Sequence, residues 1–371
     1  MVVGTVREIK AQEYRVGLTP DCVKSFVMRG HSVLYESGAG SNAGFEDDEY
    51  RAAGATVLAD AKRIYNESQM IVKVKEPLPS EYDLLHEDQI LFTYLHLAAS
   101  LDLTQALLDR KIKGVAYETI ETPEHTLPCL RPMSEIAGRL SIQEGAKYLE
   151  RTYGGRGVLI GGVPGVERGK VTIIGGGVVG LNACKVAVGM GAEVTILDIS
   201  SDRLAYLDDI FSTHITTLYS TDSNIEKVLP ESDLVIGAVL LPGERAPRVV
   251  RRSHLATMKK GAVIVDVAVD QGGCIETTHP TTHDDPVFVV DGVVHYCVAN
   301  MPGAVALSST QALTSTTLPY ALLIAERGLE GACRTSIAAH RGVNVYAGKL
   351  VHPGVARAFS MDWTPLDDIM E

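Results

Sequence analysis

Residues 171–200, VTIIGGGVVGLNACKVAVGMGAEVTILDIS, form the stretch that decides the fold. A run of apolar, mostly β-branched residues is followed by the glycine-rich turn 175–180, a helical stretch and a second apolar run, 194–197. An acid, Asp198, ends the second run. This order of strand, GxGxxG turn, helix, strand and acid is typical of a dinucleotide-binding βαβ unit. A glycine-rich turn in some other α/β fold is the alternative, and the order of the flanking elements argues against it.

Each part of this unit has a physical role in binding a dinucleotide. Gly175 permits a tight turn, Gly177 lets the backbone approach a pyrophosphate, and Gly180 allows the helix to pack closely on the strand. The helix N-terminus then presents unpaired N–H groups and the positive end of its dipole to the phosphates. Asp198 is placed to accept hydrogen bonds from both ribose hydroxyls and to repel a 2′-phosphate. The sequence therefore predicts that the chain binds NAD rather than NADP.

Length, charge and cysteine spacing restrict the class of protein. A chain of 371 residues is too long for one compact core and predicts two domains. The net charge of −12, without a basic run, argues against nucleic acid or an anionic membrane as a partner. The apolar stretches are too short to span a membrane, and the N-terminus carries charge where a signal peptide is apolar. The 6 cysteines show no CxxC spacing and the 11 histidines no ligand cluster, so we expect no disulfide framework, no metal and a cytoplasmic location.

Alternating strands and helices predict an α/β fold with two doubly wound, Rossmann-like domains and parallel sheets. In the first domain, apolar runs predict strands at 2–6, 32–35, 70–74, 90–95 and 114–117. In the second, they predict strands at 171–174, 194–197, 234–236, 262–267 and 293–298. Thr19-Pro20 is typical of a helix start, a long helix is expected from about 133 to 151, and the tail from Ser308 reads as helical. The glycine-rich segment 153–170 is either a flexible linker or an ordered hairpin, which the sequence does not decide.

We expect the tail to pack back on the first domain, because its apolar face needs a partner. The substrate domain is then discontinuous, residues 1–128 and 307–371, and the NAD-binding domain comprises residues 129–306. Ligands bind beyond the carboxyl ends of the strands in open parallel sheets, so we expect the active site in the cleft between the two domains.

Four polar residues lie at such strand ends: Arg15, Lys75, His96 and Asp270. Two cations can clamp a carboxylate, a histidine can carry a proton near neutral pH, and an acid can orient an amine or a water. Surface cations are usually solvated, and a histidine on an apolar strand is more often a hydrogen-bonded core residue. The four positions indicate a site only jointly, beside the NAD motif. Burial and the two neighbouring cations would favour a neutral imidazole at His96.

Two further charged residues are expected to be structural. Lys73 and Asp266 lie deeper in their strands than Lys75 and Asp270 do, farther from the mouth where a ligand would bind.

The segments EYRVGLTP, VKVKEPLPSEY, LHLAAS, PMSEIAGRLSIQEGA, DVAVDQGGC and HYCVANMPGAV carry a resemblance to a known family. From end to end, the chain resembles the L-alanine dehydrogenases. The resemblance implies an NAD-dependent, reversible oxidative deamination of L-alanine to pyruvate and ammonium, in a homohexamer. It also implies that Arg15 and Lys75 hold the carboxylate and carbonyl oxygen of the substrate, and that His96 and Asp270 are catalytic.

The same resemblance implies a set of cofactor contacts. Beyond the glycines and Asp198, these are Ser134, Val178, Val179, Arg203, Ser220, Val239, Leu240, Val267, Ala268, Val269, Asp270, Val298, Ala299, Asn300 and Met301. The chain departs from the usual pattern at Ala306, Leu307 and Ser315, where a proline, a basic residue and an asparagine are common. The departures put local backbone rigidity and a cofactor-side contact in doubt but remove no catalytic group.

Two other functions remain open. A soluble nicotinamide-nucleotide transhydrogenase component has a related fold and exchanges hydride between nucleotides. That family carries a RAQSMDALSS-like loop where this chain has RPMSEIAGRLS, and it has no need of a carboxylate clamp. A non-catalytic NAD-binding protein is the second alternative, and the intact set of four polar residues argues against it.

Overall fold

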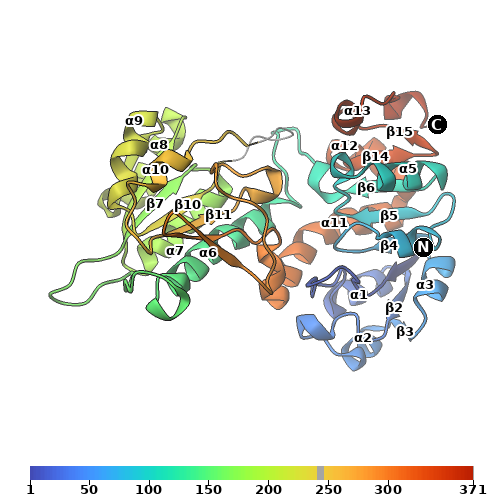
Figure 1. Cartoon of the computed structure of the whole chain (residues 1–371). Helices are drawn as coiled ribbons and strands as arrows, with labels where there is room; N and C mark the ends of the chain where they lie inside the picture. Colours follow the sequence, from blue (N-terminus) through green and yellow to red (C-terminus); the bar gives the residue numbers. More distant parts are fainter. Residues whose placement is uncertain (240–245, 371) are drawn as a thin grey trace. The chain divides into compact units, whose positions relative to one another are not determined.

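The computed structural model describes residues 1–239 and 246–370 and divides the chain into two compact units (Figure 1). Unit 1 comprises Met1–Met133 and Gly303–Glu371, and unit 2 comprises Ser134–Pro302. The expected division, at 128/129 and 306/307, differs from this one by a few residues. The substrate and cofactor roles assigned to the two parts stay a prediction.

Unit 1 is built on an 8-stranded sheet of order β15-β14-β6-β5-β4-β1-β2-β3. Its parallel strands are β1 (Val2–Thr5), β2 (Ser32–Glu36), β3 (Thr56–Leu58), β4 (Met70–Val72), β5 (Ile90–Thr93) and β6 (Lys113–Ala116). From β1 the chain moves outward through β2 and β3, then returns to β4 on the other side and continues through β5 and β6. The strand order therefore reverses between β1 and β4, which is where doubly wound sheets bind ligands.

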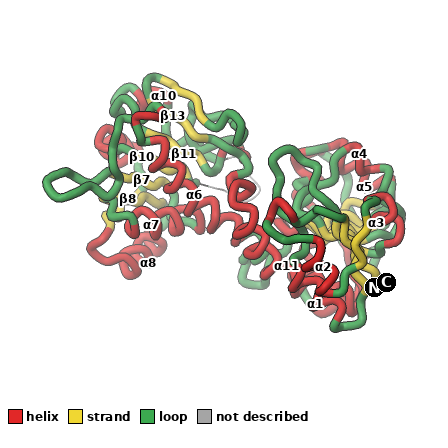
Figure 2. Tube along the Cα trace, turned by 90° about the horizontal axis from the view of Figure 1, so that it is seen from below, coloured by secondary structure: helices red, strands yellow, loops and turns green. Residues whose placement is uncertain are grey.

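Helices lie around the strands of unit 1 (Figure 2). They are α1 (Pro20–Val27), α2 (Asp47–Ala53), α3 (Ala61–Glu67), α4 (Pro79–Tyr82), α5 (Leu101–Asp109), α11 (Ala306–Thr335), α12 (Ile337–Gly342) and α13 (Pro353–Phe359). The expected start of α1 is confirmed, because the Thr19 side chain accepts a hydrogen bond from the Cys22 backbone N–H and Pro20 occupies the first turn.

The expectation of a helical tail is only partly right. The tail belongs to unit 1 and contains α11, α12 and α13, but it also adds β14 (Val343–Tyr346) and β15 (Lys349–Leu350) to the sheet. Strand β14 runs antiparallel to β6, and β15 antiparallel to β14, so the sheet is not wholly parallel as expected. The close approach of β14 to β6 depends on Gly114, where a Cβ would lie 2.5 Å from Cγ2 of Val345.

Unit 2 is built on a 7-stranded sheet of order β12-β13-β11-β10-β7-β8-β9. Its strands are β7 (Lys170–Ile174), β8 (Glu193–Asp198), β9 (Ile215–Tyr219), β10 (Leu234–Gly237), β11 (Val263–Asp266), β12 (Val287–Val290) and β13 (Val293–Tyr296). All pairings are parallel except that of β12 with β13. The strand order reverses between β7 and β10, as in nucleotide-binding sheets, and β7 leads directly into the glycine-rich turn.

The helices of unit 2 are α6 (Arg131–Tyr148, which begins in unit 1), α7 (Val178–Gly189), α8 (Ser201–Phe211), α9 (Asp222–Val228) and α10 (Arg252–Leu255). The segment after α6, which the sequence left undecided, forms turns and an isolated antiparallel bridge, Val163 to Val166, and no strand of a regular hairpin. It extends away from the rest of unit 2 as a loop (Figure 1). Among the described residues no helix is long and apolar enough to cross a membrane.

Candidate active site

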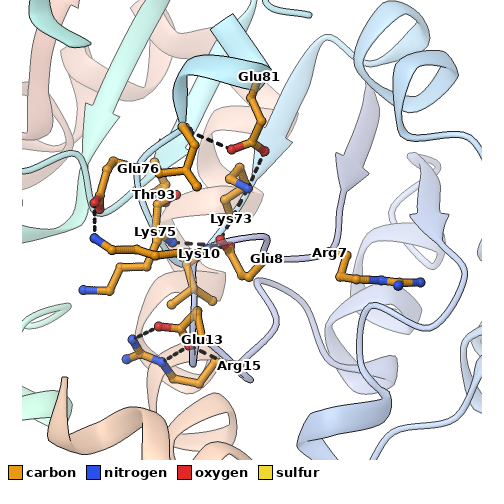
Figure 3. Close-up of polar contacts among 12 residues, drawn as sticks. Arg7, Glu8, Lys10, Glu13, Arg15, Lys73, Lys75, Glu76, Glu81 and Thr93 are labelled. Carbon is orange, nitrogen blue, oxygen red and sulfur yellow. Dashed lines mark hydrogen bonds and ion pairs between the residues drawn. The ribbon is translucent and has the colours of Figure 1, made fainter. Parts of the chain in front are cut away.

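The strand-order reversal in unit 1 brings together the loops that carry two of the expected substrate residues. Arg15 lies in the loop that follows β1, and Lys75 follows β4, the strand hydrogen-bonded to β1. The Thr5 hydroxyl donates to the Val72 carbonyl across these strands at 2.9 Å. The side chains of Arg15 and Lys75 extend to the same side in Figure 3.

A carboxylate that the sequence analysis did not single out holds Arg15. The Nε and Nη2 atoms of Arg15 donate to the two Glu13 carboxylate oxygens at 2.7 and 2.6 Å. Both side chains are buried, with 2% and 0% of their surfaces exposed. Burial opposes both charges, but the mutual hydrogen bonds outweigh it, so the pKa of Glu13 is lowered and that of Arg15 is raised. Glu13 thus fixes the plane of a permanently charged guanidinium.

Lys75 differs from Arg15 because its ammonium makes no hydrogen bond or ion pair with any of residues 1–239 and 246–370. The backbone of Lys75 is fixed, however. Its N–H donates to Oε1 of Glu8 at 3.3 Å, and its carbonyl accepts from the Thr93 hydroxyl at 3.0 Å. Burial, and then the nearby charge of Arg15, lower the pKa of Lys75. A half-buried cation held in place without a partner is suited to bind an anionic ligand.

Lys73 has the structural environment expected of it. Its side chain is 0% exposed, and its ammonium lies 2.8 Å from Oε1 of Glu81 and 3.3 Å from Oε2 of Glu8. Burial disfavours the charge on Lys73, but the two glutamates together raise its pKa. Oε1 of Glu8 also accepts from the Val74 N–H at 2.6 Å, so this buried network anchors the strand end that carries Lys75 (Figure 3).

His96 follows β5, the strand next to β4, and its environment differs from the expected one. Its side chain is 43% exposed, so the expectation of burial is wrong. The carboxylate of Glu118 lies 4.0 Å from Nδ1 of His96, whereas the expected neighbours were cations. The ring of His96 also stacks on the ring of Tyr94, with centroids 5.8 Å apart. The strand ends after Thr93, earlier than expected, and this leaves His96 in a surface turn.

In unit 2, the glycine-rich turn has the geometry that a dinucleotide requires. Gly175 has a φ of +103°, which side-chain-bearing residues rarely adopt, and a Cβ on Gly180 would lie 1.8 Å from the Gly175 carbonyl oxygen. A Cβ on Gly177 would meet nothing within 4 Å, so the space beside it is open. Gly177 also precedes α7 without a side-chain cap, which leaves N–H groups at the helix start for a phosphate.

Asp198 and Arg203 both contact this turn. Oδ2 of Asp198 accepts from the Gly176 N–H at 2.6 Å, and Oδ1 from the Ser200 N–H at 2.8 Å. Arg203 donates from Nε to the Gly176 carbonyl and from Nη2 to the Gly177 carbonyl. Asp198 therefore supports the turn, and its acceptor oxygens lie at the end of β8, where the adenosine ribose binds in such folds. The residues fit a dinucleotide.

Asp270 lies in a 3₁₀ turn, Val269–Gln271, beyond the end of β11. Asp266, which ends β11, is buried and accepts from the Ala268 N–H at 3.1 Å and the Thr278 hydroxyl at 2.6 Å, a structural role. Burial raises the pKa of Asp266.

The other expected cofactor residues also follow strands or open helices in unit 2, and their contacts to a ligand stay a prediction. Ser134 lies in the first turns of α6, Val178 and Val179 begin α7, Ser220 follows β9, Val239 follows β10, Val267, Ala268 and Val269 follow β11, and Val298, Ala299, Asn300 and Met301 follow β13. Leu240 lies outside the described residues. In the described part of the chain, no group of three or more His, Cys, Asp or Glu could hold a metal.

The departures at Ala306, Leu307 and Ser315 all fall in α11. Ala306 is buried, Leu307 is exposed, and the Ser315 hydroxyl donates to the Ala312 carbonyl of its own helix at 2.8 Å. The helix forms through all three positions.

Both units match families of known proteins. Residues 4–137 match the family described as alanine dehydrogenase/PNT, N-terminal domain, and residues 141–353 match alanine dehydrogenase/PNT, C-terminal domain. The chain is 55% identical over 368 residues to an alanine dehydrogenase of Methanococcus maripaludis, covering 99% of both chains. It is 51% identical over 372 residues to alanine dehydrogenase 2 of Staphylococcus aureus, covering 100% of both.

Two solved structures of similar proteins have the same fold. A structure titled L-alanine dehydrogenase superposes with a TM-score of 0.95 at 55% identity and covers 97% of this chain and 99% of that one. A transhydrogenase from Sinorhizobium meliloti superposes with a TM-score of 0.80 at 25% identity and covers 95% and 99%.

Proposed function

Because this chain belongs to the alanine dehydrogenase/PNT family, we propose that it is an NAD-dependent L-alanine dehydrogenase. The reaction is L-alanine + NAD⁺ + H₂O ⇌ pyruvate + ammonium + NADH + H⁺. The observation that carries the proposal is the pair of cations, Arg15 and Lys75, at the strand-order reversal of unit 1, with a Lys75 ammonium that lacks a partner among the described residues.

Arg15 and Lys75 bind the carboxylate and the carbonyl oxygen of pyruvate, or the carboxylate of alanine. Arg15 is aligned by Glu13 and Lys75 is held through its backbone, so the two cations are fixed before the substrate arrives. Fixing two points of a three-carbon acid leaves it little rotational freedom, and this positions Cα for reaction.

His96 takes the proton of the water that attacks the imine of alanine and returns protons as the carbinolamine collapses to pyruvate and ammonium. Its exposed position beside the carboxylate of Glu118 permits exchange of that proton with solvent. Asp270 orients the ammonium or the water.

NAD is held by the glycine-rich turn, the start of α7 and Asp198. The Asp198 carboxylate favours the ribose diol of NAD over the 2′-phosphate of NADP. Held there, NAD⁺ would supply the acceptor for the hydride from Cα of alanine. The substrate residues and the cofactor turn belong to different units, so the proposed reaction requires both.

A transhydrogenase component is less well supported. The S. meliloti transhydrogenase shares 25% identity, against 55% for the M. maripaludis alanine dehydrogenase, and hydride exchange between two nucleotides needs no carboxylate clamp. A non-catalytic NAD-binding protein would not require a lysine that is fixed through its backbone and whose ammonium has no partner among the described residues.

We further propose a homohexamer in the cytoplasm. Exposed apolar side chains on the loop after α6, Leu159, Val163 and Val166, support self-association. All 6 cysteines are buried free thiols, which is consistent with a reducing compartment. Light scattering should give six times the 39.8 kDa chain mass, and a lower multiple would exclude the hexamer.

Steady-state kinetics test the activity. NADH oxidation should require pyruvate and ammonium together, and NADPH should support it far less well. NADH oxidation that is unchanged when ammonium or pyruvate is omitted would exclude an alanine dehydrogenase.

A further inference from the structure

The backbone of His96 is held in an unusual conformation. Its φ of 48° and ψ of 37° place it in the left-handed region, which non-glycine residues avoid because Cβ crowds the following carbonyl. Such residues persist where their surroundings enforce them, and they cluster at functional sites. The contacts that enforce this conformation therefore bear on the function of His96.

Those contacts come from Glu118, in the 3₁₀ turn Tyr117–Thr119 directly after β6. Its Oε1 accepts from the His96 N–H at 2.6 Å and from the Leu95 N–H at 3.1 Å, and its Oε2 lies 3.3 Å from the same Leu95 nitrogen. Two successive N–H groups that converge on one anion form a backbone nest. One carboxylate thus joins the ends of the neighbouring strands β5 and β6 and fixes the turn that carries His96.

The same carboxylate faces the imidazole. Oε1 of Glu118 lies 4.0 Å from Nδ1 of His96, while the Tyr94 ring stacks on the imidazole at an interplanar angle of 10°. A carboxylate on the Nδ1 side of the ring favours the tautomer that carries its proton on Nδ1. The atom left for proton exchange with a substrate is then Nε2.

We propose that Glu118 is a positioning residue for His96, which fixes its backbone through the nest and directs its proton chemistry to Nε2. This inference rests on the proposed alanine dehydrogenase activity. Glu118 itself does not touch the substrate in this account, and its effect on turnover passes through His96.

Other ionisable groups surround this turn and enter any pH dependence. Tyr94 is buried and its hydroxyl donates to the Cys129 carbonyl at 2.7 Å. Helices α5 and α13 pack against the 3₁₀ turn Leu97–Ala99 that follows His96, and they contribute Asp102 and Arg357. His352 directly precedes α13, and burial lowers its pKa although the charge of Glu118 opposes that shift. A variant of Glu118 must therefore be followed at His96 itself.

Two variants separate the roles of the carboxylate. Glu118→Gln keeps an oxygen that can accept the two backbone N–H groups but removes the negative charge, whereas Glu118→Ala removes both. Glu124→Gln is the matched control, since Glu124 is an exposed carboxylate on the same connection between β6 and α6.

The readout is the rate of diethylpyrocarbonate labelling at one alkaline pH, measured for each histidine by peptide mass spectrometry, because the rate then reports how nucleophilic each neutral imidazole is. In Glu118→Gln the rate at His96 should fall by about twofold or more, since no carboxylate polarises the proton on Nδ1 and Nε2 becomes a weaker nucleophile. The exposed His86 should keep its rate in every variant, and so should His96 in Glu124→Gln. An unchanged rate at His96 in Glu118→Gln would overturn the proposal.

Turnover tests the backbone role. At high pH, Glu118→Gln should keep kcat within about threefold of the unmodified enzyme, whereas Glu118→Ala should lose about tenfold or more with KM for pyruvate within about twofold. Equal kcat in both variants, or a loss confined to KM, would overturn it. If the unmodified protein failed to turn over pyruvate, the proposed function would fail, while the labelling experiment would still decide whether Glu118 controls His96.

Discussion

Replacing Lys75 by methionine separates substrate binding from folding more cleanly than any other change at the site. The ammonium of Lys75 has no hydrogen-bond partner among the described residues, and burial and Arg15 lower its pKa. A cation whose pKa is lowered in the folded state destabilises that state at neutral pH, since the unfolded chain carries the charge at lower cost. Lys75→Met leaves no carboxylate unpaired, so we expect the free energy of unfolding to stay the same or rise by up to about 1 kcal/mol.

The loss in activity should be large by contrast. Truncating one member of a desolvated charge pair costs about 2–5 kcal/mol, and the partial exposure of Lys75 places it near the lower end. A loss of about 2–3 kcal/mol corresponds to about a 30- to 150-fold fall in kcat/KM for pyruvate. NADH affinity should not change, because the cofactor turn lies in unit 2.

The assay is steady-state amination at saturating NADH and ammonium with pyruvate varied, together with NADH fluorescence titration and urea unfolding. Lys62→Met, an exposed lysine on α3, serves as the control. A kcat/KM within threefold of the unmodified enzyme would show that the substrate anion binds elsewhere. A loss of unfolding free energy above about 2 kcal/mol would show that the ammonium is a structural partner after all.

The same lysine predicts a pH dependence. The protonated form binds the anion, so KM for pyruvate should rise as pH increases through the pKa of Lys75, which lies below its ordinary value of 10.5. In Lys75→Arg this rise should disappear, because arginine does not titrate in that range. A rise that persists in Lys75→Arg would assign the titration to another group.

Three further changes have distinct outcomes. Arg15→Met removes the ion pair and the two side-chain hydrogen bonds that the buried Glu13 carboxylate receives from Arg15, and it should destabilise the fold by about 3–5 kcal/mol in urea unfolding; adding Glu13→Gln should restore much of the stability but not pyruvate turnover. Lys73→Met removes the buried partner of Glu8, whose pKa burial already raises. A carboxylate with a raised pKa in the folded state contributes stability at acid pH and loses it as pH rises. This variant should therefore be least destabilised near pH 4 and most destabilised at neutral pH. An equal loss of unfolding free energy at both pH values would contradict the ion pairing of Lys73 with Glu8. Asp198→Ala should narrow the preference for NADH over NADPH on the order of tenfold, about 1.4 kcal/mol, and an unchanged ratio of kcat/KM values would place the discrimination elsewhere.

Sequence patterns predicted the parts of the fold whose signal is local. The GxGxxG turn predicted the β7–α7 junction because the required backbone is itself a glycine property, as the positive φ of Gly175 shows. Thr19-Pro20 predicted the start of α1 because the capping oxygen and the fixed φ of proline are likewise properties of the residues themselves. Strands β14 and β15 were missed because VNVYAGKL is short and follows a long helical pattern, and its strand character depends on pairing with β6, far away in sequence. Alternating valines before an Ala-Gly turn were the available signal.

In the candidate site, too, features with a local sequence signal were predicted and features that depend on distant contacts were not. The roles of the two cations stay a prediction, whereas their positions at strand ends were predictable because each directly follows an apolar run or its loop. Their carboxylate partners were not, although Glu13 lies two residues from Arg15, because an acid in a loop is usually solvated. The burial of His96 was overestimated, since the apolar run 90–95 gave no sign that the strand ends after Thr93. Glu118 reaches His96 only through the pairing of β5 with β6, which the sequence did not specify.

The transfer of deuterium from NADH to the product tests the central claim most directly. With NADH dideuterated at C4 of the nicotinamide, pyruvate and ammonium, the enzyme should form L-alanine that carries one deuterium on Cα, detected by mass spectrometry after chiral separation. Arg15 and Lys75 hold the acid in this account while the cofactor turn holds NADH, so label must pass between the two. Unlabelled alanine, or deuterium found only in a second nucleotide, would contradict the account.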